Sequence, residues 1–174
     1  MIEISKAVTN ETEEIQRVFY ETWLATYPNE DAGVTVSDIE DLYAGAFSQE
    51  KLQLLRDSIE NPADNQTLLV AHESGKVVGV CRIVRREEYN QLQAIYVLPN
   101  FQRKGIGSGL WKASEEFLEP GKDTVVEVAT YNQPAIEFYK RLGFKDTGER
   151  FKNERFRMKS GAVIPEMRMR LQAL

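Results

Sequence analysis

The sequence predicts an α/β domain in which helices pack against a sheet. Two apolar strands, Leu68–Ala71 and Val77–Val84, flank the turn sequence Glu73-Ser74-Gly75-Lys76 and are typical of an antiparallel hairpin. Further along, apolar strands alternate with helical patterns, which is the order of an α/β fold. The 174 residues, 42% of them apolar, suit one continuous core. We therefore expect a single domain over residues 1–174.

The first third of the chain predicts one short strand followed by helices. Ile2–Ala7 has the pattern of a strand, and Asn10 or Thr12 precedes two glutamates in the manner of a helix start. The next apolar residues recur at helical spacing, and Tyr27-Pro28 ends that helix. Residues 37–59 predict one or two further helices interrupted near Gly45, and residues 61–65 a loop.

The remaining elements continue the alternation of strand and helix. A strand is expected at Leu92–Leu98, followed by a glycine-rich turn and a helix with Ile106, Leu110, Ala113 and Phe117 on one face. A strand at Val125–Thr130 leads to a helix at Pro134–Leu142, which begins with proline and ends at a glycine. Residues 144–171 read as a pair of strands joined by a turn at Ser160-Gly161.

Composition excludes several classes of protein. One cysteine and one histidine supply neither an internal disulfide nor the ligands of a structural zinc, so no metal is expected. Cys81 reads as a small buried apolar residue, and His72 as a structural histidine with no partner recognisable from spacing. No window reaches the ~20 apolar residues of a membrane span, and the N-terminus lacks a secretory pattern. These features indicate a cytoplasmic protein that does not enter membranes, and they leave its oligomeric state open.

Charge is distributed unevenly along the chain. The net charge is −5, but residues 139–174 carry ten basic and four acidic residues, or +6, which leaves −11 for residues 1–138. The acidic total argues against a general nucleic-acid binder. The run 150–159 interleaves basic and aromatic residues, which suits nucleic acid, although an exposed strand explains it better. An RNA-associated protein therefore stays as a third reading of the sequence.

The most informative segment is residues 97–110, where a strand runs through a glycine-rich turn into a helix. Glycines allow backbone amides to face an open concavity, and the helix start adds its positive dipole. Arg103 and Lys104 add two charges, which suits a diphosphate. A Walker A loop fails because Gly109 is followed by Leu110, and a dinucleotide fingerprint lacks its third glycine. A plain turn that starts a helix remains the alternative.

A second segment, residues 125–144, places two titratable side chains where apolar residues dominate. Glu127 lies between valines in the expected strand, so it is at a strand end, faces an opening or is functional. Tyr139 shares a helical face with Ala135, Phe138 and Leu142, which also fits a core aromatic.

Together the two segments resemble the signature motifs of the GCN5-related N-acetyltransferase (GNAT) superfamily. Gln102-Arg103-Lys104-Gly105-Ile106-Gly107 resembles its acetyl-CoA loop, and Asn132 to Phe144 resembles the helix after its fifth strand. The resemblance is sharp over residues 92–144 and loose elsewhere. It implies a mixed, strongly twisted sheet that is split between strands 4 and 5, flanked by helices, with acetyl-CoA wedged into the split.

The resemblance also assigns roles to residues. Cofactor binding falls to main-chain groups of Ile95, Tyr96 and Val97, to the loop residues Gln102, Arg103, Lys104, Gly105, Ile106, Gly107 and Ser108, and to Asn132 and Ala135. Tyr139 matches the tyrosine that protonates the leaving thiolate in many members. Glu127, twelve residues earlier, stands where relatives that acetylate protein N-termini have their base. Gln91 and Gln93 replace a glutamate common near the fourth strand, which shifts the base role to Glu127 or to water.

The expected reaction is direct acetyl transfer from acetyl-CoA to a primary amine. An ammonium with a pKa near ~10.4 must lose its proton at a cost of roughly 4 kcal/mol at neutral pH, so a base is needed. The resemblance implies that the acceptor enters opposite the cofactor, against the first two helices and the last strands. Tyr27, Glu30 and Asp31, with the acidic stretch at 38–41, lie in that region and would form a wall that attracts cations. Residues 21–28 weakly resemble spermine/spermidine acetyltransferases, so a polyamine is the first expectation and a peptide α-amine or lysine the second. A catalytically silent CoA-binding module is the alternative from another class.

Overall fold

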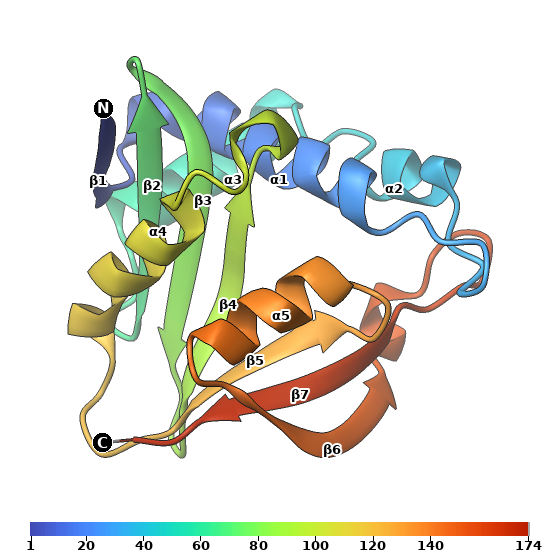
Figure 1. The fold of residues 1–174 in the computed structure, drawn as a ribbon. Coiled ribbons are helices and arrows are strands. Elements are labelled where there is room, and N and C mark those ends of the chain that lie inside the picture. Colours follow the sequence, from blue (N-terminus) through green and yellow to red (C-terminus); the bar gives the residue numbers. More distant parts are fainter. Residues whose placement is uncertain (174) are drawn as a thin grey trace.

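A single mixed sheet organises the molecule (Figure 1). The structure is a computed structural model that describes residues 1–173. Its strands lie in the order β1-β2-β3-β4-β5-β7-β6. Only the β4–β5 pair is parallel; the other neighbours are antiparallel. The strands are β1 (Ile2–Lys6), β2 (Gln66–Glu73), β3 (Lys76–Arg85), β4 (Asn90–Val97), β5 (Thr124–Ala129), β6 (Lys145–Lys152) and β7 (Pro165–Leu171).

Helices cover both faces of this sheet. In Figure 1, α4 (Ile106–Ser114) and α5 (Gln133–Arg141) lie in front of it, whereas α1 (Thr12–Thr26) and α3 (Gln49–Glu60) lie behind. The short helix α2 (Val36–Leu42) lies beyond the end of α1. This arrangement confirms the mixed α/β fold expected from the sequence.

The main core lies between the sheet and its helices. Val126 pairs with Met169 and Val128 with Met167, so these four side chains share the face against which α5 packs. A second, smaller cluster contains Val34, Ile39, Ala129, Met158 and Ile164, and it joins the α1–α2 region to the β6–β7 connection.

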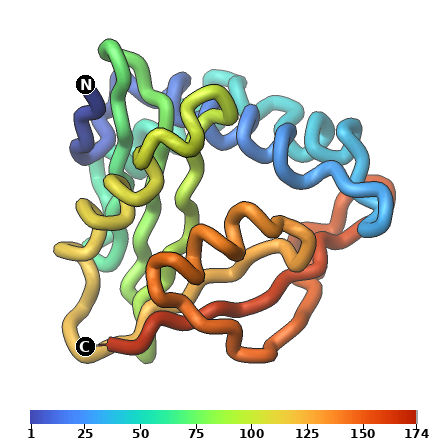
Figure 2. Tube along the Cα trace, viewed as in Figure 1, coloured from blue at the N-terminus to red at the C-terminus, as the bar shows by residue number. Residues whose placement is uncertain are grey.

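The sheet is split between β4 and β5. Register pairs join only Asn90 to Thr124 and Gln91 to Val125, and beyond them the strands diverge. The register of β3 against β4 also shifts, because Ile83 faces Leu92 but Arg82 faces Ala94, which leaves an extra residue on β4. Figure 2 shows the two traces separating. Beyond Gln91, β4 and β5 therefore have no backbone pairing with each other.

Two elements differ from the sequence prediction. The terminal strands are joined by the long connection 153–164, which contains the turn predicted at Ser160-Gly161, and Ser160 binds Asp38 and so holds the connection against α2. The helix that starts at Ile106 ends at Ser114, whose hydroxyl donates to the carbonyl oxygen of Trp111, and the chain tightens into a 3-10 turn. Ala113 and Phe117 are partly buried against the same core as Ile106 and Leu110, as predicted, and Trp111 and Ser114 are buried more completely.

The structure also shows the surroundings of Cys81 and His72, the single cysteine and the single histidine. Cys81 is fully buried, as expected, and burial raises the pKa of its thiol to about 12. His72 has a partner that spacing did not reveal, because its Nε2 lies 2.5 Å from Oε1 of Glu11 near the start of α1. Within residues 1–173, no helix is long and apolar enough to cross a bilayer.

Candidate active site

A cleft of about 610 Å³ opens where β4 and β5 separate. Its lining comes from the second half of β4, the glycine-rich loop, β5, α5 and the end of α1. Every predicted cofactor residue except Lys104 lines it, and so do Tyr27, Glu127 and Tyr139. The two sequence segments that suggested chemistry, residues 97–110 and 125–144, are thus brought to one cavity.

The glycine-rich loop offers a row of free amides to this cleft. Arg103 and Gly105 adopt left-handed backbone conformations, with φ of +60° and +80°. Within residues 1–173, no hydrogen bond uses the backbone N–H groups of residues 103–108. The last of these amides belong to the first turn of α4, where the helix dipole is positive. Consecutive unpaired amides at a helix start form a binding site for an anion such as a diphosphate.

Neighbouring side chains fix the shape of this loop. Nε2 of Gln102 donates to the carbonyl oxygen of Val97 at 3.0 Å, which ties the loop to the end of β4. A Cβ atom built on Gly107 would lie 3.4 Å from the ring of Phe138, so α4 and α5 approach closely there. The ammonium of Lys104 lies 4.9 Å from the ring centroid of Phe101, and this residue does not line the cleft.

Tyr139 reaches the cleft from α5. The side chain of Asn132 caps this helix by accepting from the N–H of Ala135 at 3.3 Å. The ring of Tyr139 is buried between Phe138 and Phe144, yet its hydroxyl makes no hydrogen bond within residues 1–173. Burial, with smaller effects from Tyr96 and Cys81, raises its pKa well above the ordinary range. A protonated, unpaired phenol at the wall of the cleft is a proton donor without a partner.

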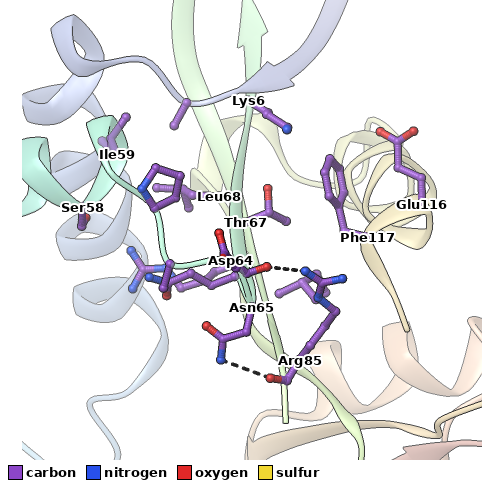
Figure 3. Close-up of a pocket in the computed structure, with 16 residues that line it drawn as sticks. Lys6, Ser58, Ile59, Asp64, Asn65, Thr67, Leu68, Arg85, Glu116 and Phe117 are labelled. Atoms are coloured by element: carbon purple, nitrogen blue, oxygen red, sulfur yellow. Dashed lines mark hydrogen bonds between the residues drawn. The ribbon is translucent and has the colours of Figure 1, made fainter. Parts of the chain in front are cut away.

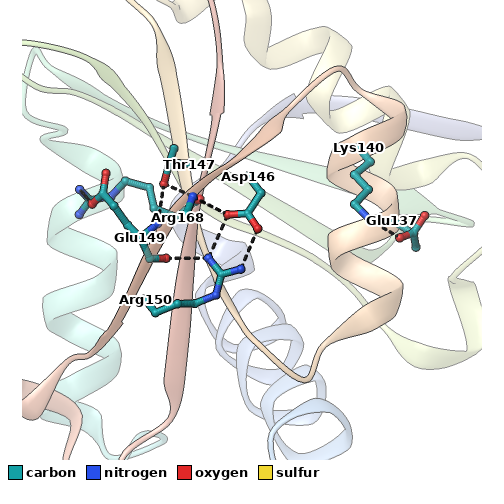
Figure 4. Close-up of polar contacts among 8 residues, drawn as sticks. Glu137, Lys140, Asp146, Thr147, Glu149, Arg150 and Arg168 are labelled. Carbon is teal, nitrogen blue, oxygen red and sulfur yellow. Dashed lines mark hydrogen bonds and ion pairs between the residues drawn. The ribbon is translucent and has the colours of Figure 1, made fainter.

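Glu127 is part of an ion-paired array across β5, β7 and β6. Its Oε1 lies 3.0 Å from Nη2 of Arg168, its register partner on β7. The other nitrogen of the same fork, Nη1, lies 2.6 Å from Oε2 of Glu149 on β6. Figure 4 shows Arg168 beside Glu149, next to the separate pair Asp146–Arg150. Glu127 thus lines the cleft with a cationic partner already in place.

Aromatic side chains form the wall on the α1 side. Trp23 Nε1 donates to the hydroxyl of Tyr96 at 3.2 Å, and the hydroxyls of Tyr27 and Tyr96 lie 3.3 Å apart. The hydroxyl of Tyr131 donates to the carbonyl oxygen of Tyr27 at 2.7 Å. Burial raises the pKa of Tyr96 and Tyr27, so both phenols stay neutral. The wall is apolar, neutral and rich in π-electron density.

The predicted acidic wall is only partly available to a ligand. Glu30 and Asp31 are exposed on the connection after α1 but do not line the cleft. Asp38 is buried and accepts hydrogen bonds from Thr35 and Ser160, so its charge serves the fold. Burial alone would raise its pKa, but these bonds outweigh burial and lower the pKa to about 2.

Sequence reasoning missed three residues at or beside the cleft. Thr22 on α1 lines the cleft, and its buried hydroxyl has no hydrogen-bond partner within residues 1–173. Arg141, at the end of α5, adds a cation to the lining. Glu166 on β7 lies opposite Ala129 and beside Glu127. The alternation Glu166, Arg168, Arg170 against Met167 and Met169 was a readable signal for one polar face on this strand.

A second cavity, of about 410 Å³, lies at another part of the sheet (Figure 3). It is lined by the end of α3, the start of β2 and the end of β3, and it contains none of the predicted site residues. Arg85 donates to the backbone oxygen of Asp64, and Asn65 donates to the backbone oxygen of Arg85 at 3.2 Å. The ammonium of Lys6 lies 5.0 Å from the ring centroid of Phe117. These contacts close a loop rather than assemble a reactive centre.

Comparisons with known proteins agree with this geometry. A family model described as an acetyltransferase (GNAT) domain matches residues 23–160. An uncharacterised N-acetyltransferase of Methanocaldococcus jannaschii is 33% identical over 92 residues, 48% of this chain and 41% of that protein. The peptidyl-lysine N-acetyltransferase YiaC of Escherichia coli is 34% identical over 98 residues, 56% of this chain and 61% of that protein. The chain thus spans between two fifths and three fifths of these relatives.

A solved structure extends the likeness to the whole fold. PaiA N-acetyltransferase of Thermoplasma acidophilum, crystallised in complex with coenzyme A, superposes with a TM-score of 0.69. The match covers 95% of this chain and 98% of that one at 22% identity. At 22% identity, this match shows that the two chains share a fold.

Proposed function

This chain belongs to the GNAT family of acetyl-CoA-dependent N-acetyltransferases, and we propose that it acetylates a primary amine on a cationic acceptor. The observation that carries the proposal is the content of one cleft. An anion cradle, an unpaired phenol and a carboxylate all face it, from the glycine-rich loop, α5 and β5. Those are the groups that acetyl transfer from a thioester to an amine requires.

The cradle is proposed to hold the diphosphate of acetyl-CoA. Free N–H groups of residues 103–108 bind phosphate oxygens, and Arg103 adds a positive charge. Backbone groups of Ile95, Tyr96 and Val97 have no strand partner on the β5 side, so they are available to the pantetheine arm and the thioester carbonyl. Asn132 and Ala135 line the path between them, at the start of α5.

Tyr139 is proposed to donate a proton to the departing thiolate. The amine nitrogen attacks the carbonyl carbon, the C–S bond breaks, and the phenol proton passes to sulfur. The raised pKa keeps the phenol protonated at neutral pH until a thiolate lies in contact with it. One positioned donor of this kind contributes on the order of 10² to the rate.

The acceptor is proposed to be a cationic amine, with a polyamine as the first expectation. Glu127 faces the cleft, and the aromatic wall of Tyr27 and Tyr131 suits an alkylammonium through cation–π contact. The exposed Glu30 and Asp31 add acidic charge on the connection after α1. A peptide amine is the second candidate, because one relative bears the name of a peptidyl-lysine acetyltransferase and the Glu127–Tyr139 spacing resembles that of N-terminal acetyltransferases.

A panel of amines tests this proposal directly. Thiol release from acetyl-CoA is measured with spermidine, a short peptide and glucosamine phosphate at equal concentration. We expect the cations to react faster than the anionic sugar, and kcat/KM for spermidine to fall with added salt. Preference for the sugar phosphate would contradict the electrostatic argument. Binding of acetyl-CoA without any thiol release would instead support a silent CoA-binding module, and titration with RNA tests the remaining class.

A further inference from the structure

Glu166 occupies a position that the reaction scheme has not yet used. Glu127 and Arg168 are register partners, and Glu166 stands two residues before Arg168 on β7. Side chains two residues apart on a strand share a face, so Glu127 and Glu166 are diagonal neighbours with Cβ atoms roughly 7 Å apart. The partner directly opposite Glu166 on β5 is Ala129, which has no polar side chain to pair with the carboxyl group.

The surroundings of the two glutamates differ in their partners. Glu127 pairs with Arg168, which also binds Glu149. Within residues 1–173, the carboxylate of Glu166 takes part in no hydrogen bond or ion pair, although the residue is half-buried. On β6, its register partner is Phe151, an apolar ring. Glu166 does not itself line the cleft, but it lies next to the cleft residue Glu127 with its carboxylate unpaired.

We propose that Glu166 is the general base that removes the proton from the acceptor ammonium, while the Glu127–Arg168 pair binds and positions that ammonium. This inference rests on the proposed acetyl transfer and names the base for it. The carboxylate of Glu166 accepts one proton from the R–NH₃⁺ group through one water, and the freed lone pair attacks the thioester carbonyl. When the C–S bond breaks, sulfur leaves with the proton of Tyr139, and the second proton lost by the nitrogen returns to the phenolate through water. Glu166 then releases its proton to solvent, so charge and protons balance.

The raised pKa of Glu166 agrees with this division of roles. Burial and then the negative charge of Glu127 raise the pKa of Glu166 to about 7. For an ammonium with a pKa near ~10.4, proton transfer to such a carboxyl is unfavourable by roughly 10³, against about 10⁶ for an ordinary glutamate. The charged and titratable groups facing Glu166 are Glu127 on β5, Arg168 on β7, Tyr96 on β4, Tyr27 at the end of α1 and Tyr131 after β5.

The pH dependence of kcat/KM distinguishes the two glutamates. With the fastest amine of the panel, the plot of log kcat/KM against pH for wild type is expected to show a limb near pH 7, where kcat/KM rises as the base loses its proton. Glu166→Gln should lower kcat/KM at pH 7.5 by about 10² and abolish that limb, leaving only the ionisation of the amine. Glu127→Gln should raise KM and move the limb to lower pH, because a neighbouring negative charge is lost. A merely structural role for Glu127 would not move the limb.

Two variants and one activity-free measurement complete the test. Glu137→Gln, an exposed glutamate paired with Lys140 on α5, serves as the matched control and should leave the profile unchanged. Glu166→Asp should retain the limb with reduced kcat. In protein carrying ¹³C-labelled glutamate, one carboxyl should titrate near pH 7 and disappear in Glu166→Gln. Titration of Glu166 below pH 5, or an unchanged limb in Glu166→Gln, overturns the inference; absence of acetylation with every amine overturns the proposed function instead.

Discussion

The cleft joins two halves that are built in different ways. The cofactor half consists of the end of β4, the loop at 102–108 and α5, and its groups come from two continuous segments, largely from the backbone. The proposed acceptor half is lined by the end of α1 and by Tyr131, and α2 and the β6–β7 connection, which are distant in sequence, pack against it. Figure 2 shows the turn after α1 and the β6–β7 connection meeting at one side of the molecule.

This difference explains what each half can recognise. Unpaired amides and a helix start bind any diphosphate of the right size, so the cofactor half needs glycines more than particular side chains. The acceptor half depends on side chains that meet only after folding, such as Tyr27 with Tyr96 and Asp38 with Ser160. Substitutions should therefore affect chemistry and cofactor affinity in the first half, and stability and acceptor affinity in the second.

The largest effect is expected at the junction of the halves. Tyr139→Phe removes an unpaired hydroxyl while keeping the packed ring, so the fold and CoA affinity should persist. We expect kcat to fall about 100-fold, or roughly 2.7 kcal/mol, in steady-state assays of thiol release. Tyr20→Phe is the control, because Tyr20 packs on Tyr43 and Phe47 and does not line the cleft. If Tyr139→Phe turns over as fast as wild type, Tyr139 is not the general acid.

The acceptor half should respond in stability to the loss of Asp38. Its carboxylate accepts four hydrogen bonds from Thr35 and Ser160, which join α2 to the β6–β7 connection. Asp38→Ala leaves those donors without an acceptor, at a cost of about 2 kcal/mol in free energy of unfolding, measured with urea. The control Asp41→Ala removes only an exposed contact with Lys159 and should cost less than about 0.5 kcal/mol. Equal losses in both variants would contradict this role.

The way the free energy of unfolding changes with pH should also depend on Asp38. The pKa of Asp38 is lowered from 3.8 to about 2 by its hydrogen bonds, which outweigh burial. A lowered carboxyl pKa means that the stabilisation is fully present above about pH 4 and is lost as the pH falls toward 2. The free energy of unfolding, measured with urea between pH 2 and 5, should therefore rise less steeply with pH in Asp38→Ala than in wild type. An identical slope would assign the acid sensitivity to other carboxyls.

In the cofactor half, the cradle is tested by Gly107→Glu. The added carboxylate repels a diphosphate, and its Cβ atom meets the ring of Phe138 at 3.4 Å. The dissociation constant for acetyl-CoA should rise at least tenfold, about 1.4 kcal/mol, by titration calorimetry. Gly107→Ala carries the same Cβ without the charge and should retain affinity within about threefold. Unchanged binding by a folded Gly107→Glu protein would exclude this loop as the diphosphate site.

The same contrast governs what could be predicted from sequence. The loop at 102–108 and the helix from Asn132 are contiguous motifs, so the fold and a set of candidate cofactor residues that share one cleft could be predicted from sequence. The partner of Glu127 was not, because Arg168 lies 41 residues further on and only strand pairing brings it near. Asp38 looked like surface charge, since nothing local signals that Ser160 folds back onto it. The predicted acidic acceptor wall therefore included one carboxylate, that of Asp38, which is instead used in hydrogen bonds that hold the fold together.

The smallest effect is expected at Thr22, whose buried hydroxyl has no partner within residues 1–173. If this hydroxyl serves the acceptor, Thr22→Val should trade binding for stability. Removal of an unpaired buried hydroxyl should stabilise the free protein by about 1 kcal/mol in urea unfolding, since valine and threonine have similar helix propensity. KM for the amine should rise about fivefold, close to 1 kcal/mol, while the dissociation constant for acetyl-CoA stays the same. If KM for the amine and the dissociation constant for acetyl-CoA rise by the same factor, Thr22 belongs to the cofactor half instead, and the boundary between the two halves lies elsewhere.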